Sequence, residues 1–139
     1  MMSAIVDTNM QVSAPSASTF RNMAVWEAGY NVCLDICRAA DQFTAQDNTI
    51  TQQLRGIATQ VPLNLSRSAS YKPGKKYLRF LKASFVSTKQ LSTLLMLSHD
   101  LNYMNTEKFL ELNSKVNIFS SKLWKYIHFI ERKVKQRSK

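Results

Sequence analysis

The chain has 139 residues, of which 45% are hydrophobic and 20% charged, so one packed domain is feasible and two would be cramped. Three glycines and three prolines are too few for a turn-rich β-sandwich or a glycine-loop nucleotide site. Nineteen Lys and Arg against nine Asp and Glu give a formal net charge of +10, which favours polyanionic partners such as RNA, DNA or acidic protein surfaces. The composition therefore predicts a small, basic, all-α protein.

The N-terminal residues 1–21 are small and polar and lack hydrophobic periodicity, which predicts a flexible arm. A first helix is predicted from about Met23 to Phe43. Its apolar residues recur at 4,3,4,3 spacing and form a single stripe: Trp26, Tyr30, Cys33, Cys37 and Ala40.

A second helix follows, with Asp47 as its predicted N-cap and an apolar face that runs from Ile50 to Leu65. Pro62 falls inside this run, where it removes one backbone donor and clashes with the preceding turn. The helix therefore either ends at Val61 or kinks at the proline. Because the apolar spacing resumes at Leu65, we expect the kink.

The clearest turn of the chain is Tyr-Lys-Pro-Gly at 71–74, and Pro73 is predicted to be the first residue of a third helix that continues to about Leu101. Asn105 is predicted to cap a fourth helix, whose apolar stripe over residues 109–130 has near-heptad spacing. Short connections force neighbouring helices to be antiparallel. The sequence therefore predicts an up-down-up-down four-helix bundle over residues 22–134, followed by a basic tail at 135–139.

Cys33 and Cys37 lie four residues apart on one face of the first predicted helix. Half of a zinc site is one interpretation, but His99 and His128 are isolated and complete no ligand set. We expect two small core residues in a reducing cytoplasm, with no metal and no cofactor. No apolar run approaches the ~18–20 residues that span a bilayer, and no secretory signal is visible, so no membrane partner is expected.

Positive charge is concentrated in two segments. Eight Lys and Arg and no acidic residue lie between Asp47 and Asp100, and four of these cations recur at 4,3,7 spacing on one helix face. A solvated surface is the alternative, but such a surface usually mixes both signs, so we expect a surface that binds polyanions. The candidate nucleic-acid or partner-binding residues are Arg55, Arg67, Lys72, Lys75, Lys76, Arg79, Lys82, Lys89, Arg132, Lys133, Lys135 and Arg137.

Four aromatic residues are interleaved with this charge: Tyr71, Tyr77, Trp124 and Tyr126. They could stack on nucleobases. Packing in the core or between subunits explains them as well, and we favour packing.

The residue patterns of common enzymes are missing. The sequence has no phosphate-cradling glycine loop, no HExxH and no paired carboxylates on one helix face in the basic region. All-helical ribonucleases that use an Arg-x4–6-His motif are also excluded, because neither His99 nor His128 has an Arg four to seven positions upstream. We therefore expect a protein that is not an enzyme.

Four stretches carry a resemblance to a known family. Val25-Trp26 matches a Val-Trp near the start of the first helix, and residues 102–105 (NYMN) echo a G-Y-L-S. Residues 50–68 read ITQQLRGIATQVPLNLSRS against L-T-x-Q-I-R-R-A-A-x-S-I-P-x-N-I-A-E-G, and residues 80–91 read FLKASFVSTKQL against F-L-x-x-A-x-G-S-x-x-E-L. Over residues 23–130 the chain resembles the small four-helix bundles first noticed as proteins encoded by intervening sequences in bacterial ribosomal RNA genes.

Two positions depart from that pattern, because Arg67 and Gln90 stand where the family usually has Glu. Such cationic members are similar to the accessory variability determinants of diversity-generating retroelements. This resemblance implies a homo-oligomer, a pentameric barrel, that binds the retroelement reverse transcriptase and RNA or cDNA during mutagenic copying. The alternative is an oligomeric protein-interaction scaffold with no direct role for nucleic acid.

Overall fold

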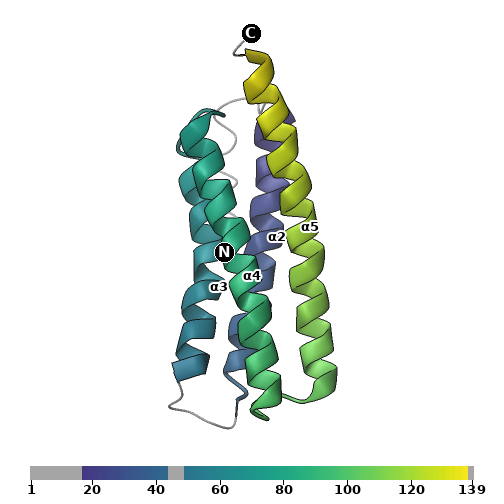
Figure 1. Cartoon of the computed structure of the whole chain (residues 1–139). Helices are drawn as coiled ribbons and strands as arrows, with labels where there is room; N and C mark the ends of the chain where they lie inside the picture. Colours follow the sequence, from purple (N-terminus) through teal and green to yellow (C-terminus); the bar gives the residue numbers. More distant parts are fainter. Residues whose placement is uncertain (1–16, 44–48, 138–139) are drawn as a thin grey trace.

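The computed structural model describes residues 17–43 and 49–137, and over these residues it contains four helices and no strand. The helices are α2 (Ala17–Ala40), α3 (Thr49–Ser68), α4 (Lys75–Asp100) and α5 (Thr106–Arg137). Figure 1 shows them side by side with alternating direction, and contacts run from α2 to α3, α3 to α4, α4 to α5 and α5 back to α2. The predicted up-down-up-down bundle is confirmed.

The core is built from the apolar stripes that the sequence predicts. Each helix turns its stripe toward the bundle axis, because residues three and four apart lie on the same helical face. Burying one Leu of this core contributes roughly 1.5–3 kcal/mol to stability. Completely buried side chains come from all four helices and include Ile36, Leu54, Val61, Leu65, Leu81, Leu91, Leu95, Val116, Phe119, Leu123, Ile127 and Ile130.

α3 passes through Pro62 without ending. The proline has no N–H to donate to the carbonyl of Ala58, so one backbone hydrogen bond of the helix is lost. Packing compensates, because Pro62 is buried and Ser84 Oγ of α4 donates a hydrogen bond of 3.0 Å to the neighbouring carbonyl of Val61. Of the two alternatives that the sequence left open, an end at Val61 is therefore wrong.

Several helix ends differ from the sequence-based expectation. α2 begins at Ala17, inside the predicted N-terminal arm, because adding a residue to an existing helix gains one hydrogen bond and needs no new nucleus. Residues 1–16 of that arm and the predicted cap Asp47 lie outside the described residues. α4 begins at Lys75 and not at Pro73, since the carbonyl of Gly74 accepts the first helical hydrogen bond, from Leu78 N–H at 3.0 Å.

The turn between α4 and α5 is defined by backbone and side-chain hydrogen bonds. Asn102 has a positive φ of 65°, a conformation that asparagine tolerates, and it ends α4 in a Schellman motif. In this motif Tyr103 N–H donates to the carbonyl of Ser98 at 2.8 Å, and Asn102 N–H to that of His99 at 2.9 Å. The predicted N-cap of α5 is confirmed, because Asn105 Oδ1 accepts a hydrogen bond of 2.8 Å from Lys108 N–H.

Candidate nucleic-acid interface

Alternating helix direction brings three basic segments to the same end of the bundle. The C-terminus of α3, the turn that leads into α4, and the C-terminus of α5 all lie at the upper end of Figure 1. We call this surface the basic end. Its cations are exposed except for the half-buried Lys133: Arg67, Lys72, Lys75, Lys76, Arg79, Arg132, Lys133, Lys135 and Arg137.

Negative charge gathers at the opposite end of the bundle. The second half of α2 with the turn after it, the last residue of α4 and the first turns of α5 meet there (Figure 1). These segments carry five of the acidic residues: Asp35, Asp41, Asp100, Glu107 and Glu111. In the half of the bundle that contains the basic end, only Glu27 and Glu131 are acidic among the described residues. The charge is therefore separated along the bundle axis, so the positive potential is concentrated at the basic end.

Most cations of the basic end have no carboxylate partner within the described part of the chain. Arg67 instead donates hydrogen bonds to two neutral amides of its own helix, Asn64 Oδ1 at 2.8 Å and Gln60 Oε1 at 3.2 Å. The Lys76 ammonium lies 5.4 Å from the ring centroid of Tyr71. These contacts orient the side chains and neutralise none of their charge, so the cations stay available to an anion.

Three of the twelve candidate residues lie apart from the basic end. Arg55 pairs with Asp41 at the acidic end, and the sequence could not show this because the partner sits in the turn after α2. Lys82 forms an ion pair of 3.0 Å with Glu131. Lys89 lies further along α4, with its ammonium 5.0 Å from the ring centroid of Phe85.

The four candidate aromatic residues divide into two pairs. Tyr77 and Tyr126 are buried and hydrogen-bonded to each other through their hydroxyl groups, so for them packing is confirmed. Burial raises the pKa of Tyr77 above its ordinary value, and the hydrogen bond with Tyr126 opposes that shift. Tyr71 and Trp124 are exposed, by 40% and 48%. Only these two present a ring to solvent.

Exposed Trp124 borders a groove that the sequence did not reveal. The groove runs between α4 and α5, has a volume of about 490 Å³, and is lined by Phe85, Lys89, Asn117, Ser120, Ser121 and Trp124. The α5 residues of this lining recur at spacings of three and four beside the core stripe. This spacing is the one feature of the sequence that could have indicated the groove.

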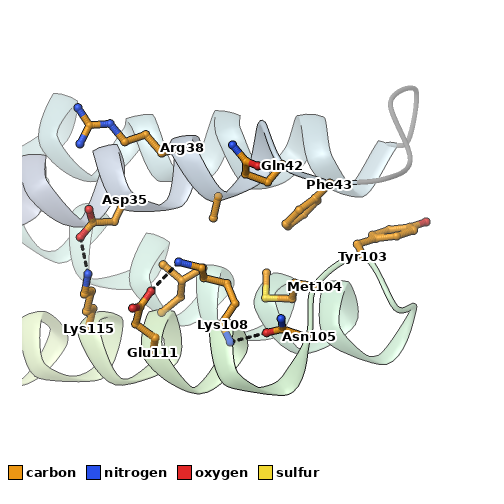
Figure 2. A pocket seen from close by; sticks show the side chains of 12 residues that line it. Asp35, Arg38, Gln42, Phe43, Tyr103, Met104, Asn105, Lys108, Glu111 and Lys115 are labelled. Carbon is orange, nitrogen blue, oxygen red and sulfur yellow. Dashed lines mark hydrogen bonds and ion pairs between the residues drawn. The ribbon is translucent and has the colours of Figure 1, made fainter.

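A larger cavity of about 710 Å³ lies near the acidic end, between α2 and α5 (Figure 2). Phe43 and Met104 contribute to its apolar part, while two ion pairs occupy its rim: Asp35 with Lys115 at 3.1 Å and Lys108 with Glu111 at 2.9 Å. The hydrogen bond and the charge of Lys108 hold the pKa of Glu111 below its ordinary value. The two lysines of this lining are therefore already paired with carboxylates, in contrast to the cations of the basic end.

Both cysteines lie on α2, where Cys33 is part of the core and Cys37 is half-buried against it. Cys33 is buried, and burial, together with the adjacent Cys37, raises its pKa to about 12, so it is a neutral thiol at physiological pH. Among residues 17–43 and 49–137, no three His, Cys, Asp or Glu side chains are grouped as metal ligands. Nor does any helix in these ranges have the length and apolar character needed to cross a membrane.

Comparisons with known proteins agree with this fold. A sequence model of the family described as 23S rRNA-intervening sequence protein matches residues 21–125. A solved structure, of a protein with unknown function from the S23 ribosomal protein family of Bacteroides thetaiotaomicron, has a TM-score of 0.73 and 12% identity over 78% of this chain and 98% of that one. No curated protein is significantly similar in sequence. Since the family match spans well over half of the chain, the protein belongs to the 23S rRNA-intervening sequence protein family.

Proposed function

We propose that this protein is a non-catalytic accessory protein that binds nucleic acid through the basic end. The observation that carries the proposal is the separation of charge along the bundle. Nine cations from α3, the following turn, α4 and α5 share one end, while most of the described carboxylates lie at the other. A surface that only kept the protein soluble would mix the two signs.

The binding would be electrostatic and largely independent of sequence. Each phosphate that a Lys or Arg neutralises releases counterions, so the logarithm of the binding constant falls by about 0.7–0.9 per contact for each decade of salt. Arg67 and Arg79 also make the contacts directional, because a guanidinium can hold two phosphate oxygens at once. Arg67 is held in place for such a contact by Asn64.

The finer role that we propose is accessory to a reverse transcriptase of a diversity-generating retroelement, with template RNA or cDNA at the basic end. Arg67 and Gln90, which replace the usual glutamates of the family, support this narrower placement because they remove negative charge from α3 and α4. A homo-oligomer, a pentamer by the same resemblance, is part of the proposal. Large apolar side chains on the outside of the helices support assembly: Val86 is 55% exposed, Leu110 58% and Ile118 55%.

Those exposed apolar residues also favour a second candidate function. In this alternative the protein is an oligomeric scaffold whose basic end meets an acidic protein, and nucleic acid has no direct role. The two candidates differ in a simple observation. A purified sample that binds neither structured RNA nor duplex DNA at 50 mM salt would favour the scaffold.

Charge reversal at the basic end tests the proposal. The double variant Lys75→Glu with Arg79→Glu places two negative charges at the start of α4, where neither side chain has a carboxylate partner among the described residues. The control, Lys122→Glu with Lys125→Glu, makes the same change in net charge on an exposed part of α5 outside the basic end. Both variants should keep the helical circular dichroism of the wild type.

We expect the basic-end variant to weaken binding to structured RNA and duplex DNA by at least about tenfold and to lower the salt slope by about 1.4–1.8, the equivalent of two contacts. The control should bind within about twofold of the wild type, since its charges lie away from the phosphates. Equal losses in both variants would show that only net charge matters, and the assignment to the basic end would then be wrong.

A further inference from the structure

The α4–α5 groove combines features that the basic end lacks. Trp124 forms one wall, with its ring centroid 5.1 Å from that of Phe85 at an interplanar angle of 37°. On another side the ring of His128 lies edge-on, at 4.3 Å and 84°. The tryptophan is therefore fixed by two neighbours while 48% of its surface is exposed. A fixed, exposed indole is a ready-made stacking surface, because little side-chain freedom is lost when a ligand binds.

Polar groups of three kinds surround this aromatic wall. Asn117 and Ser121 are exposed, and their side chains make no hydrogen bond to another described residue, so an amide and a hydroxyl are available to a ligand. Ser120 is already engaged, since Thr88 Oγ1 donates to its hydroxyl at 3.2 Å. Lys89 supplies the one positive charge of the lining, and the lining contains no carboxylate.

We propose that this groove binds an unpaired nucleobase of a single-stranded nucleic acid, stacked on Trp124, with Lys89 against a flanking phosphate. The inference rests on the proposed function and names the form of nucleic acid that the protein prefers. A base in a duplex is covered on both faces by its neighbours and cannot reach Trp124. An aromatic wall, an amide, a hydroxyl and a single cation match the faces, edges and phosphate of one nucleotide.

The position of the groove supports the same occupant. Lys89, Lys82, Arg79 and Lys75 follow one another along the outer face of α4, from the groove to the basic end. With a rise of 1.5 Å per residue, the 14 residues from Lys75 to Lys89 span about 21 Å. A strand with the stacked geometry of a duplex rises about 3.4 Å per nucleotide, so this length holds about six stacked nucleotides, or fewer of an extended single strand. One strand can thus lie on the basic end and place a base in the groove.

The first experiment compares a 12-nucleotide oligouridylate with a 12-base-pair duplex, by fluorescence anisotropy at low salt. Trp124→Ala should weaken binding of the single strand by at least about fivefold, the lower range for one stacked base. Binding of the duplex should stay within about twofold of the wild type. Trp124→Phe keeps a stacking ring and should restore most of the single-strand affinity. The matched control is Met96→Ala, which truncates an apolar side chain of α4 that is 54% exposed and does not line the groove.

Equal binding of the single strand by Trp124→Ala and the wild type would overturn the groove assignment and leave the basic end standing. If the wild type bound neither the single strand nor the duplex, both the groove assignment and the proposed function would be wrong. A second measurement does not depend on removing Trp124. The chain has two tryptophans, so Trp26→Phe leaves Trp124 as the sole indole, and its fluorescence should be quenched by oligouridylate. Quenching that follows protein concentration instead would assign the groove to a contact between copies and overturn the proposal.

Discussion

Lys82 Nζ of α4 lies 3.0 Å from Glu131 Oε2 of α5, and this ion pair joins the two helices whose ends make up most of the basic end. The ring of His128, which packs against Trp124, also lies close to this carboxylate, with Nδ1 3.1 Å from Glu131 Oε1. One carboxylate therefore lies close both to Lys82 and to a ring that packs against Trp124 of the α4–α5 groove. Any strand that follows the outer face of α4 passes beside this negative charge.

Glu131→Gln should strengthen nucleic-acid binding, because it frees Lys82 for a phosphate and removes the repulsion of a carboxylate. We expect binding about two- to fivefold tighter near 100 mM salt and a salt slope steeper by about one contact. Stability should change by less than about 1 kcal/mol, since the two side chains are 54% and 37% exposed. A salt series of anisotropy titrations measures both quantities. Glu107→Gln, the same loss of charge at the acidic end, should leave binding unchanged, and an equal gain there would contradict the local mechanism.

Gly29 sets how closely α2 approaches its neighbours. A Cβ at this position would lie 2.8 Å from Leu65 Cδ1 and 3.0 Å from Phe119 Cζ, both of them on buried side chains. Gly29→Ala should therefore destabilise the protein by about 1–3 kcal/mol through overpacking. The opposite result is expected for Gly56→Ala, where nothing lies within 4 Å of the new methyl group and helix propensity alone acts. That variant should gain about 0.5–1 kcal/mol. Chemical denaturation measures the free energy of unfolding of both variants. A gain in both would contradict the close packing of α2 against Leu65 and Phe119 at Gly29.

The four helices could be predicted because their apolar stripes are long and regular. The stripe over residues 109–130 and its cap at Asn105 were both readable, since a capping side chain acts within three residues of its own position. Convergence of the basic segments also follows from short connections, which fix helix direction without reference to any side chain. Local rules thus gave the bundle. The spacing of the sequence predicted four of the cations on one face of the third helix, whereas the meeting of the basic segments at one end of the bundle was not predicted.

Features that depend on a partner distant in sequence could not be predicted. Tyr77 and Trp124 both stand beside an apolar stripe, yet Tyr77 is buried because Tyr126, 49 residues away, satisfies its hydroxyl group. Trp124 stays exposed where the surfaces of α4 and α5 diverge into a groove. The partner of Arg55 was hidden for the same reason. Periodicity gives the face of a helix on which a residue lies, but not which side chain of another helix meets it.

Asn105 contributes to stability through a single hydrogen bond, from Lys108 N–H to its side-chain oxygen. Asn105→Ala removes the acceptor and should lower the free energy of unfolding by about 1 kcal/mol. Asn105→Ser keeps a capping oxygen and should lose much less. Thermal melts followed by circular dichroism compare the two variants, and equal losses would mean that the cap does not act through its side-chain oxygen.

Cys33 should make the protein sensitive to alkaline pH. Its pKa is raised from 9.0 to about 12, chiefly by burial and further by the charge and hydrogen bond of Cys37. The unfolded chain therefore releases this proton at lower pH than the folded protein does. The stabilising contribution is fully present below pH 9 and is lost as the pH rises from there toward 12.

Urea denaturation at a series of pH values from 8 to 10 checks this effect, in a range that lies mostly below the ordinary pKa of tyrosine. We expect the free energy of unfolding of the wild type to fall over this range, whereas that of Cys33→Ala, which has no thiol to titrate there, should fall distinctly less. Cys37→Ala tests the coupling between the two thiols, because it removes the neighbouring charge and hydrogen bond and should reduce the alkaline loss only in part. Parallel curves for the wild type and Cys33→Ala would show that the Cys33 thiol titrates alike in the folded and unfolded chains, and the burial of its sulfur would then not govern its ionisation.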